Sequence, residues 1–365
     1  MVKLAFCTDG IFPHSVGGMQ RHSRLLIEEL SRYDIHITVF HPHKDFLFEK
    51  YSNITEIYIE DIDKNKNYLK ENYNYSKRIY EHLKTMPEHV IYSQGLSVWY
   101  RISKLSNKII VNPHGLEPYQ ALSRKDKLVA IPFKWVFNYI FKKVDYVVSL
   151  GGLLTDILQE IVSKDKIVIL PNGVNLPENF TLAEKPNLPV NLLFVGRFAS
   201  NKGIDLLLQV AQELNTEGFS EKVNYKLAGK GPLWEKMQAE YPLPNVEFLG
   251  FVTDEQLSVL YAVSHVFVLP TLFEGMPTVV HEAMTHSLPI IVSNVGATAE
   301  QVDVTNGYLL ERNNKLALKK AITGFVGLSL EQKTAMGAAS LKRVEDNFLW
   351  KVVAQKHFCL FQKLA

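Results

Sequence analysis

Two glutamates eight residues apart, Glu274 and Glu282, are the side chains of this chain best suited to chemistry. The apolar run at 265–270 predicts a buried strand, and from Pro277 onward the pattern predicts a helix. Glu274 then lies in the strand-to-helix loop, where Gly275 lets the backbone approach a ligand, and Glu282 lies on the helix. Free amides at such a helix start bind anions. Two carboxylates beside an anion site suit a ligand with hydroxyls and phosphate, such as a nucleotide sugar, although a solvated glutamate in an ordinary turn is the alternative.

A second loop carries two cations after a predicted strand at 191–195. Arg197 offers a planar fork to phosphate oxygens, and Lys202 offers a mobile point charge. Gly203 and the start of a predicted helix at 204–214 follow, so the loop suits a diphosphate, with a solvated charged turn as the alternative. The sequence has no Cys/His cluster and no D-x-D pair placed for a metal. The two cations would therefore have to do the work that Mg²⁺ does elsewhere.

The N-terminal half opens with a βαβ pattern that has glycines at the helix start. Strands are predicted at 2–8 and 35–40, and a helix is predicted at 19–32, directly after Gly17 and Gly18. The G-x-G-x-x-G spacing is absent, so a dinucleotide fingerprint is not supported. The glycines indicate either close approach of the backbone to a phosphate or sugar, or a plain tight turn.

One histidine lies where open α/β sheets bind their ligands. His114 follows a predicted strand at 109–112, just beyond its carboxyl end. A lone histidine is more often structural, but this position favours a functional role. Strand and helix patterns then alternate up to Asn172, and they restart near residue 190 after a polar stretch punctuated by prolines. The alternation predicts an α/β fold with two domains.

Composition excludes several other classes of protein. The chain has 365 residues, of which 47% are hydrophobic and 21% charged, as in ordinary soluble proteins. A net charge of only +2 gives no general attraction for nucleic acid. Cys7 and Cys359 lie at opposite ends, so a disulfide framework is not expected and a reducing cytoplasm fits. We expect neither a signal peptide nor a membrane-spanning segment.

These residues, in their order along the chain, resemble the retaining glycosyltransferases of family 4, which have the GT-B fold. The resemblance covers nearly the whole chain and is most specific in the second half. Its motifs are Gly17-Gly18, His114, Asn172-Gly173-Val174, Gly196-Arg197 with Lys202-Gly203, Gly229-Lys230-Gly231-Pro232, and Glu274 with Glu282. Two positions depart from the family pattern: Ser287 stands where glycine is common, and Ala297 stands where a second glycine is common. Both flank the predicted site.

The resemblance implies a role for each motif residue. Arg197 and Lys202 would bind the donor diphosphate, Glu274 the sugar hydroxyls and Glu282 the ribose. Gly18 would approach the phosphate, and the histidine would lie against the donor sugar. The predicted catalytic residues are His114, Arg197, Lys202 and Glu274. The predicted donor-binding residues are Gly17, Gly18, Asn172, Gly196, Arg197, Lys202, Gly231, Glu274, Gly275, Met276, Pro277, Thr278 and Glu282.

The resemblance also implies an architecture and a reaction. We expect two Rossmann-like domains facing across a cleft: an acceptor domain at 1–172, a linker at 173–189, a donor domain at 190–345, and a helix at 346–365 that packs back on the first domain. The family moves a sugar from a nucleotide donor, here a UDP-sugar or GDP-sugar, with retention of configuration and usually without a metal or other cofactor. The expected acceptor is a glycan or lipid-linked chain in cell-envelope polysaccharide, lipopolysaccharide or glycolipid synthesis. The rivals are a hydrolase that uses Glu274 and Glu282 as its carboxylate pair, and a catalytically silent scaffold subunit.

One feature lies outside the motif set. Residues 101–143 hold nine basic side chains and two acidic ones, and a helix rich in aromatic residues is predicted at 132–143. Lys134, Asn138 and Lys142 would form a narrow polar stripe on it. This pattern suits an interfacial helix on an anionic membrane, with residues 124–143 as the docking surface on the inner face of the plasma membrane. The alternative is a core helix with a polar edge.

Overall fold

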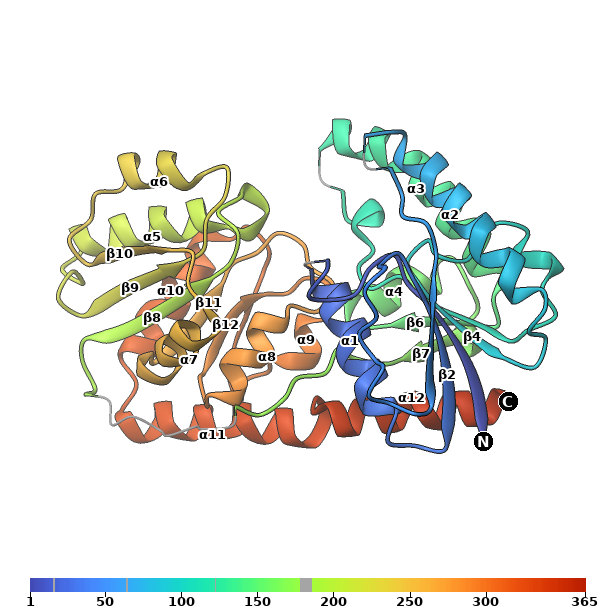
Figure 1. Ribbon diagram of the computed structural model, residues 1–365. Coiled ribbons are helices and arrows are strands. Elements are labelled where there is room, and N and C mark those ends of the chain that lie inside the picture. Colours follow the sequence, from blue (N-terminus) through green and yellow to red (C-terminus); the bar gives the residue numbers. More distant parts are fainter. Residues whose placement is uncertain (16, 64, 122, 178–185) are drawn as a thin grey trace. The chain divides into compact units, whose positions relative to one another are not determined.

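The chain folds into two α/β units, each built on one parallel sheet (Figure 1). The computed structural model describes residues 1–365 apart from 16, 64, 122 and 178–185. Unit 1 comprises Met1–Gly173 and Trp350–Ala365, and unit 2 comprises Val174–Leu349. The linker at 173–189 stays a prediction, because 178–185 lie outside the described residues. The predicted α/β fold class is confirmed.

Unit 1 is organised around a seven-stranded sheet whose described strands have the order β3-β2-β1-β4-β5-β6-β7. All residues of β4 and β5 are buried, because these strands are apolar on both faces. A strand of this kind needs helices on both sides of the sheet, which is typical of parallel sheets. The strands are β1 (Val2–Cys7), β2 (Ile35–His41), β3 (Ile54–Tyr58), β4 (Val90–Gln94), β5 (Ile109–Asn112), β6 (Tyr146–Ser149) and β7 (Ile167–Ile169). The helices are α1 (Gly18–Leu30), α2 (Tyr68–Leu83), α3 (Arg124–Lys143), α4 (Leu153–Gln159) and α12 (Trp350–Leu364).

Helix α12 belongs to unit 1, although it follows unit 2 in the sequence. It lies beside α1 and also packs against β1 (Figure 1). Trp350, Val353 and Phe361 of α12 join Leu26 and Ile27 of α1 in one buried cluster. Burying one such side chain stabilises a fold by about 1.5–3 kcal/mol. Without α12, the sheet and α1 would leave a large apolar face uncovered.

Unit 2 contains a six-stranded sheet whose described strands have the order β10-β9-β8-β11-β12-β13. The order reverses between β8 and β11, as it does between β1 and β4 in unit 1. The loops that leave two such strands diverge, and open parallel sheets bind ligands there. The strands are β8 (Val190–Val195), β9 (Val223–Ala228), β10 (Val246–Gly250), β11 (Val266–Leu269), β12 (Ile290–Ser293) and β13 (Gly307–Leu310). The helices are α5 (Ile204–Thr216), α6 (Trp234–Glu240), α7 (Asp254–Val263), α8 (Thr278–Thr285), α9 (Thr298–Gln301), α10 (Lys315–Val326) and α11 (Leu330–Asn347).

The elements that differ from the sequence-based prediction include α3, β3 and α6. The helix predicted from Pro132 begins at Arg124, because the hydroxyl of Ser123 caps it by accepting a hydrogen bond from the N–H of Asp126 at 3.0 Å. The sequence pattern predicts neither β3 nor α6. Strand β3 lies at the edge of its sheet and is only half-buried, and α6 buries little besides Met237, so both lack a strong apolar pattern. Within the described ranges, no helix combines the length and apolar character needed to cross a bilayer.

Candidate active site

The predicted donor site of unit 2 lies in the loops that leave β8 and β11, on either side of the reversal in strand order. Residues 196–203 connect β8 to α5, and residues 270–277 connect β11 to α8. Two hydrogen bonds join the loops at the carbonyl of Asn201. The N–H of Leu272 and the hydroxyl of Thr271 both donate to it at 2.8 Å. The loops therefore form one surface at the position where such sheets bind ligands.

An ion pair on this surface joins a predicted cation to a predicted carboxylate. The ammonium of Lys202 lies 2.5 Å from Oε1 of Glu274, and the two side chains are 25% and 12% exposed. The hydroxyl oxygen of Thr271 also lies 3.0 Å from the same carboxylate oxygen, so its proton is shared between Glu274 and Asn201. Because the ion pair is partly shielded from water, the attraction between its two charges is stronger than in bulk solvent. This attraction holds both side chains in one geometry. Because both still reach solvent, an anion can approach Lys202 while sugar hydroxyls approach Glu274.

Two glycines allow the loops to approach so closely. Gly203 has a φ of +68°, and a Cβ there would lie 2.0 Å from the carbonyl oxygen of Pro270. Gly229, which follows β9, has a φ of +123°, and a Cβ there would lie 2.0 Å from the carbonyl oxygen of Gly196. Only glycine combines this conformation with this proximity. The loops after β8, β9 and β11 are thus in contact backbone to backbone.

Glu282 lies half-buried on α8 and has a different partner. The hydroxyl of Tyr261, on α7, donates to Oε2 of Glu282 at 3.2 Å. Burial raises the pKa of Tyr261, and the neighbouring carboxylate of Glu282 raises it further. The phenol therefore stays protonated at neutral pH. It acts as a hydrogen-bond donor that orients the carboxylate.

Most of the other predicted residues of unit 2 are uncharged and contribute to the site through their backbone. Arg197 is the exception, and its side chain is exposed. Gly231 lies so close to the first loop that a Cβ there would be 2.5 Å from the carbonyl oxygen of Phe198. Gly275 follows the ion-paired glutamate and is half-buried. The remaining three lie at the start of α8 and are Met276, Pro277 and Thr278, the first two of them buried.

The predicted glycine pair of unit 1 stands at the start of α1. Gly17 precedes the first turn, and Gly18 is the first residue of the helix. A Cβ at Gly18 would meet no described atom within 4 Å. The first amides of a helix lack partners within it and attract anions. An anionic group can therefore approach this helix start closely.

His114 follows β5 in a left-handed conformation, with a φ of +59°. Its N–H donates to Oδ1 of Asn112 at 2.9 Å, and its Nε2 hydrogen-bonds with Oε1 of Gln94. Burial, and to a lesser extent the nearby His357, lower the pKa of His114 to about 3. The imidazole is therefore neutral at pH 7. It can form hydrogen bonds with a sugar, but it brings no charge to the site.

Two histidines that the sequence pattern does not reveal, His22 and His357, lie near His114. The ring of His22, on α1, meets the ring of His114 edge-on with centroids 4.9 Å apart, and it lies 6.1 Å from the ring of His357 on α12. Burial, and then the other two histidines, lower the pKa of His22, whereas the predicted residue Asn172 raises it. The available signal was spacing, because His22 lies four residues, about one helical turn, after Gly18.

A chain of hydrogen bonds runs from α12 to His114. Nε2 of His357 and the hydroxyl of Tyr92 are 3.1 Å apart, and Nδ2 of Asn112 donates to that hydroxyl at 3.0 Å. The same asparagine accepts the N–H of His114. The C-terminal helix thus supports the unusual backbone conformation of His114 through two intermediate side chains.

Comparison with known proteins identifies the family of this chain. The family described as Glycosyltransferase Family 4 matches residues 16–178, and the one described as Glycosyl transferases group 1 matches residues 189–326. Together they cover most of the chain. The chain belongs to the group 1 glycosyltransferases of the family 4 type.

Individual relatives extend along the whole of this glycosyltransferase. An uncharacterized glycosyltransferase of Methanocaldococcus jannaschii is 25% identical over 96% of both chains. Among solved structures, sucrose-phosphate synthase of Thermosynechococcus elongatus superposes with a TM-score of 0.80 at 20% identity, covering 100% of this chain and 99% of that one. HepE of Anabaena, in complex with UDP and glucose, superposes with a TM-score of 0.70 at 15% identity and covers both chains fully. The expected GT-B fold is confirmed.

The two departures from the family pattern have different structural consequences in this glycosyltransferase. Ser287 has a φ of +54°, a conformation in which glycine is unstrained and serine is not. Ala297 is buried without such a requirement, and its N–H donates to the carbonyl of Gly275 at 2.8 Å. The preceding Gly296 is the position that needs glycine, because a Cβ there would lie 2.3 Å from the carbonyl oxygen of Glu274. The second substitution therefore leaves the site loop in place.

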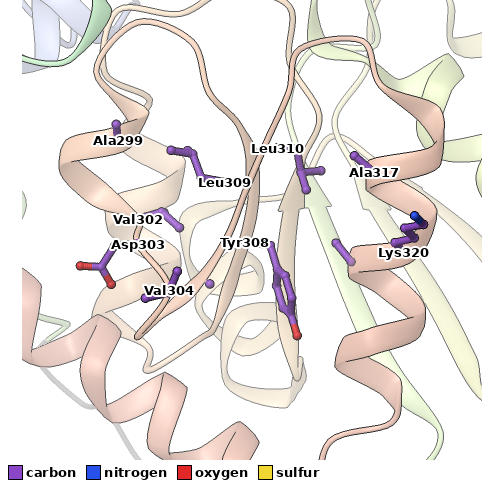
Figure 2. A pocket seen from close by; sticks show the side chains of 11 residues that line it. Ala299, Val302, Asp303, Val304, Tyr308, Leu309, Leu310, Ala317 and Lys320 are labelled. Carbon is purple, nitrogen blue, oxygen red and sulfur yellow. The ribbon is translucent and has the colours of Figure 1, made fainter.

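A separate hollow of about 750 Å³ lies between α9, β13 and α10 of this glycosyltransferase (Figure 2). Its lining is mostly apolar and includes Val302, Tyr308 and Leu310. None of the predicted site residues lines it. Among the described residues, no three His, Cys, Asp or Glu side chains gather so that they could hold a metal ion.

Proposed function

We propose that this chain is a retaining, metal-independent glycosyltransferase that moves a sugar from a nucleotide-sugar donor to a glycan or lipid-linked acceptor. The observation that carries the donor assignment is the Lys202–Glu274 ion pair, 2.5 Å long, on the loops at the strand-order reversal of unit 2. One half of the pair suits phosphate, and the other suits sugar hydroxyls. UDP is bound in the structure of HepE, which supports a nucleotide sugar as the donor.

The residues divide the work between the two ends of the donor. Lys202 and the exposed Arg197 would bind the diphosphate and stabilise the charge that develops on it as the sugar leaves. Glu274 would hold the sugar, with the amides of Gly275 and Met276 beside it. Glu282, oriented by Tyr261, would hold the ribose. The acceptor attacks from the face that the diphosphate leaves, and a phosphate oxygen takes the acceptor proton, so the configuration is retained.

The hydrogen-bond partners of Glu274 and Glu282 favour a role in donor binding over the hydrolase alternative. A hydrolase needs one carboxylic acid that can give a proton to the leaving group. Glu274 instead contacts an ammonium, and Glu282 accepts a hydrogen bond from a phenol, so both carboxyl groups already serve as acceptors for donors of this chain. We assign the acceptor class on the family resemblance alone. We also place the enzyme in the cytoplasm, a proposal supported by two free cysteines, one buried and one exposed.

The first experiment is a thermal-shift screen of UDP-, GDP- and ADP-sugars against the purified protein, followed by turnover with an acceptor mixture. We expect one nucleotide series to stabilise the protein, activity to survive EDTA, and NMR to show a product of unchanged anomeric configuration. Metal-dependent activity, an inverted product or a covalent glycosyl adduct on either glutamate would contradict the mechanism. A protein that neither binds nor turns over any nucleotide sugar would be the silent scaffold.

Substitution of the ion pair tests the site itself. Lys202→Ala should lower kcat/KM by about 30- to 1,000-fold, as loss of one group that stabilises the transition state typically does. The matched control is Lys226→Ala. Lys226 is also 25% exposed and pairs with Glu247 at 2.8 Å, but both residues lie within strands, β9 and β10, and not in the loops. We expect near-normal turnover in the control, and equal turnover in both variants would reject the assignment.

A further inference from the structure

Helix α3 of unit 1 begins as a segment that the rest of the unit leaves uncovered. Residues 123–129 are all exposed, so the first turns of the helix are reached by solvent from every side. Only farther along does the helix join the core. Its buried residues are Ala130, Val136, Phe137, Ile140 and Phe141. The expectation of a core helix is therefore correct for one face, and it leaves the opposite face unexplained.

That opposite face carries large apolar side chains in one line. Leu128, Ile131 and Trp135 are 68%, 57% and 69% exposed. Their spacing of three and four residues places them on a single side of the helix. Tyr139 continues the line, with its ring stacked on that of Trp135 at 6.4 Å. We call the line from residue 124 to residue 142 the exposed stripe.

Basic residues stand at both ends of the exposed stripe and beside it. Arg124 is four residues before Leu128, and Lys142 is seven residues after Trp135, so both lie on the same side of the helix as the apolar residues. The helix as a whole carries six basic side chains and one acidic one, Asp126. Asp126 contributes to the helix cap, since Ser123 donates to its carboxylate at 2.6 Å. No ion pair involves any of the six cations within the described part of the chain.

We propose that the exposed stripe is a docking surface for an anionic lipid bilayer. Apolar side chains between two sets of unpaired cations match the boundary between acyl chains and anionic headgroups. Long basic side chains can keep their charges in the headgroup layer while the apolar residues enter below it. A protein groove would cover one face of the helix, whereas the first turns of α3 are exposed on all faces, which suits immersion in a lipid layer. The proposal goes beyond sugar transfer and does not depend on it.

Two of the three polar residues predicted as a stripe, Lys134 and Asn138, have another use. Oδ1 of Asn138 accepts the hydroxyl of Tyr119 at 2.7 Å, and the ammonium of Lys134 lies 5.3 Å from the centre of the same ring. These residues are half-buried and attach α3 to its neighbours in unit 1. The lipid-facing side is therefore that of Leu128 and Trp135, about 60–80° around the helix axis from Asn138.

The test is co-sedimentation of the full chain with vesicles of phosphatidylcholine alone, or of phosphatidylcholine mixed with phosphatidylglycerol, at low and high salt. We expect binding to the anionic vesicles only, weakened by salt. Binding should also shift tryptophan emission to the blue, because Trp135 is the most exposed of the four tryptophans. Absence of binding to anionic vesicles, or equal and salt-independent binding to both kinds, would overturn the proposal.

Variants with matched controls locate the surface. Replacing Lys125 and Lys127 together by Gln should weaken vesicle binding about 25-fold, since each charge near an anionic surface contributes about fivefold. Trp135→Ser should weaken it and abolish the emission shift. The controls lie in unit 2: Phe251→Ser removes an aromatic side chain that is 81% exposed, and Lys236→Gln removes an exposed cation. If the controls weaken binding as much as the α3 variants do, the stripe is not the docking surface.

These substitutions are at exposed positions, so folding should persist, and the melting temperature of each variant checks this. Donor binding in the absence of vesicles separates this inference from the proposed function. A protein that binds nucleotide sugar and ignores vesicles refutes docking alone. A protein that binds vesicles and no nucleotide sugar refutes the transferase proposal alone.

Discussion

The candidate residues of unit 1 and those of unit 2 differ in both chemistry and origin. In unit 2 the predicted residues are charged, they come from two short loops, and their partners are close in sequence or in the adjacent loop, as for Lys202 and Glu274. In unit 1 they centre on His114, which burial keeps neutral, and their neighbours come from α1, α12 and the segment after β7. The side chains of unit 2 are thus suited to hold a charged ligand, whereas the histidines of unit 1 offer uncharged hydrogen bonds. The comparison also predicts that the two units respond differently when they are perturbed.

The largest expected effect concerns the dependence of unit 1 on α12. Phe361 is fully buried, and its ring centre lies 5.4 Å from that of Tyr92. Phe361→Ala should lower the free energy of unfolding of unit 1 by about 3–5 kcal/mol, because it removes an aromatic ring and leaves a cavity. Hydrogen exchange should show lost protection in β1 and β4 and unchanged protection in β8.

The reciprocal control is Phe325→Ala on α10, a residue 1% exposed in the core of unit 2. It should lower protection in β8 and leave β1 unchanged. If either variant loses protection equally in both units, the two units unfold together. That result would contradict the predicted difference between them.

The second effect is the response of unit 1 to acid. Burial lowers the pKa of His114 to about 3 and that of His357 to about 4, whereas an unfolded histidine has a pKa near 6.5. Between pH 6.5 and 4 the unfolded chain therefore binds more protons than the folded one, so the stability of unit 1 falls as pH falls. Each histidine contributes up to about 1.4 kcal/mol per pH unit.

His357→Gln keeps a hydrogen-bonding group opposite Tyr92 but cannot titrate in this range, so it should make the pH dependence shallower. His281→Gln is the control, because His281 is a buried histidine of unit 2 whose pKa burial lowers to about 3. It should leave the slope of unit 1 unchanged. Chemical denaturation followed by hydrogen exchange at several pH values measures both slopes, and identical slopes in wild type and His357→Gln would count against the neutral histidine cluster.

The histidine cluster and the charged loops were not equally predictable from the sequence. Glu274, Lys202 and Arg197 were found because a loop after an apolar strand, with glycine beside it, is visible in the sequence itself. His22 and His357 were missed because each occupies an ordinary position in a helical pattern, and only the packing of α12 against α1 brings them together. The alternation of strands and helices predicted the fold class. The half-buried edge strand β3 was not predicted, because its apolar pattern is weak.

The smallest expected effect concerns Ser287, where unit 2 departs from its family. A φ of +54° costs a non-glycine residue about 1 kcal/mol, so Ser287→Gly should raise the stability of unit 2 by up to that amount with no loss of activity. Asn313→Gly is the control. Asn313 has a φ of +57°, but asparagine tolerates this conformation better, so the gain should be smaller. Thermal melts of the two variants measure the difference, and a destabilised Ser287→Gly would show that the serine side chain contributes more than its backbone strain costs.

The position of α12 also has a consequence for biosynthesis. A ribosome makes residues 1–173 first, then the whole of unit 2, and only then the helix that covers Leu26, Ile27 and Leu30. The apolar face of the nascent first unit therefore stays uncovered while the 176 intervening residues, 174–349, are translated. Unit 2 has no such dependence and can complete its core while it emerges. Folding during synthesis is thus expected to finish with the second unit before the first, in the reverse of their order along the chain.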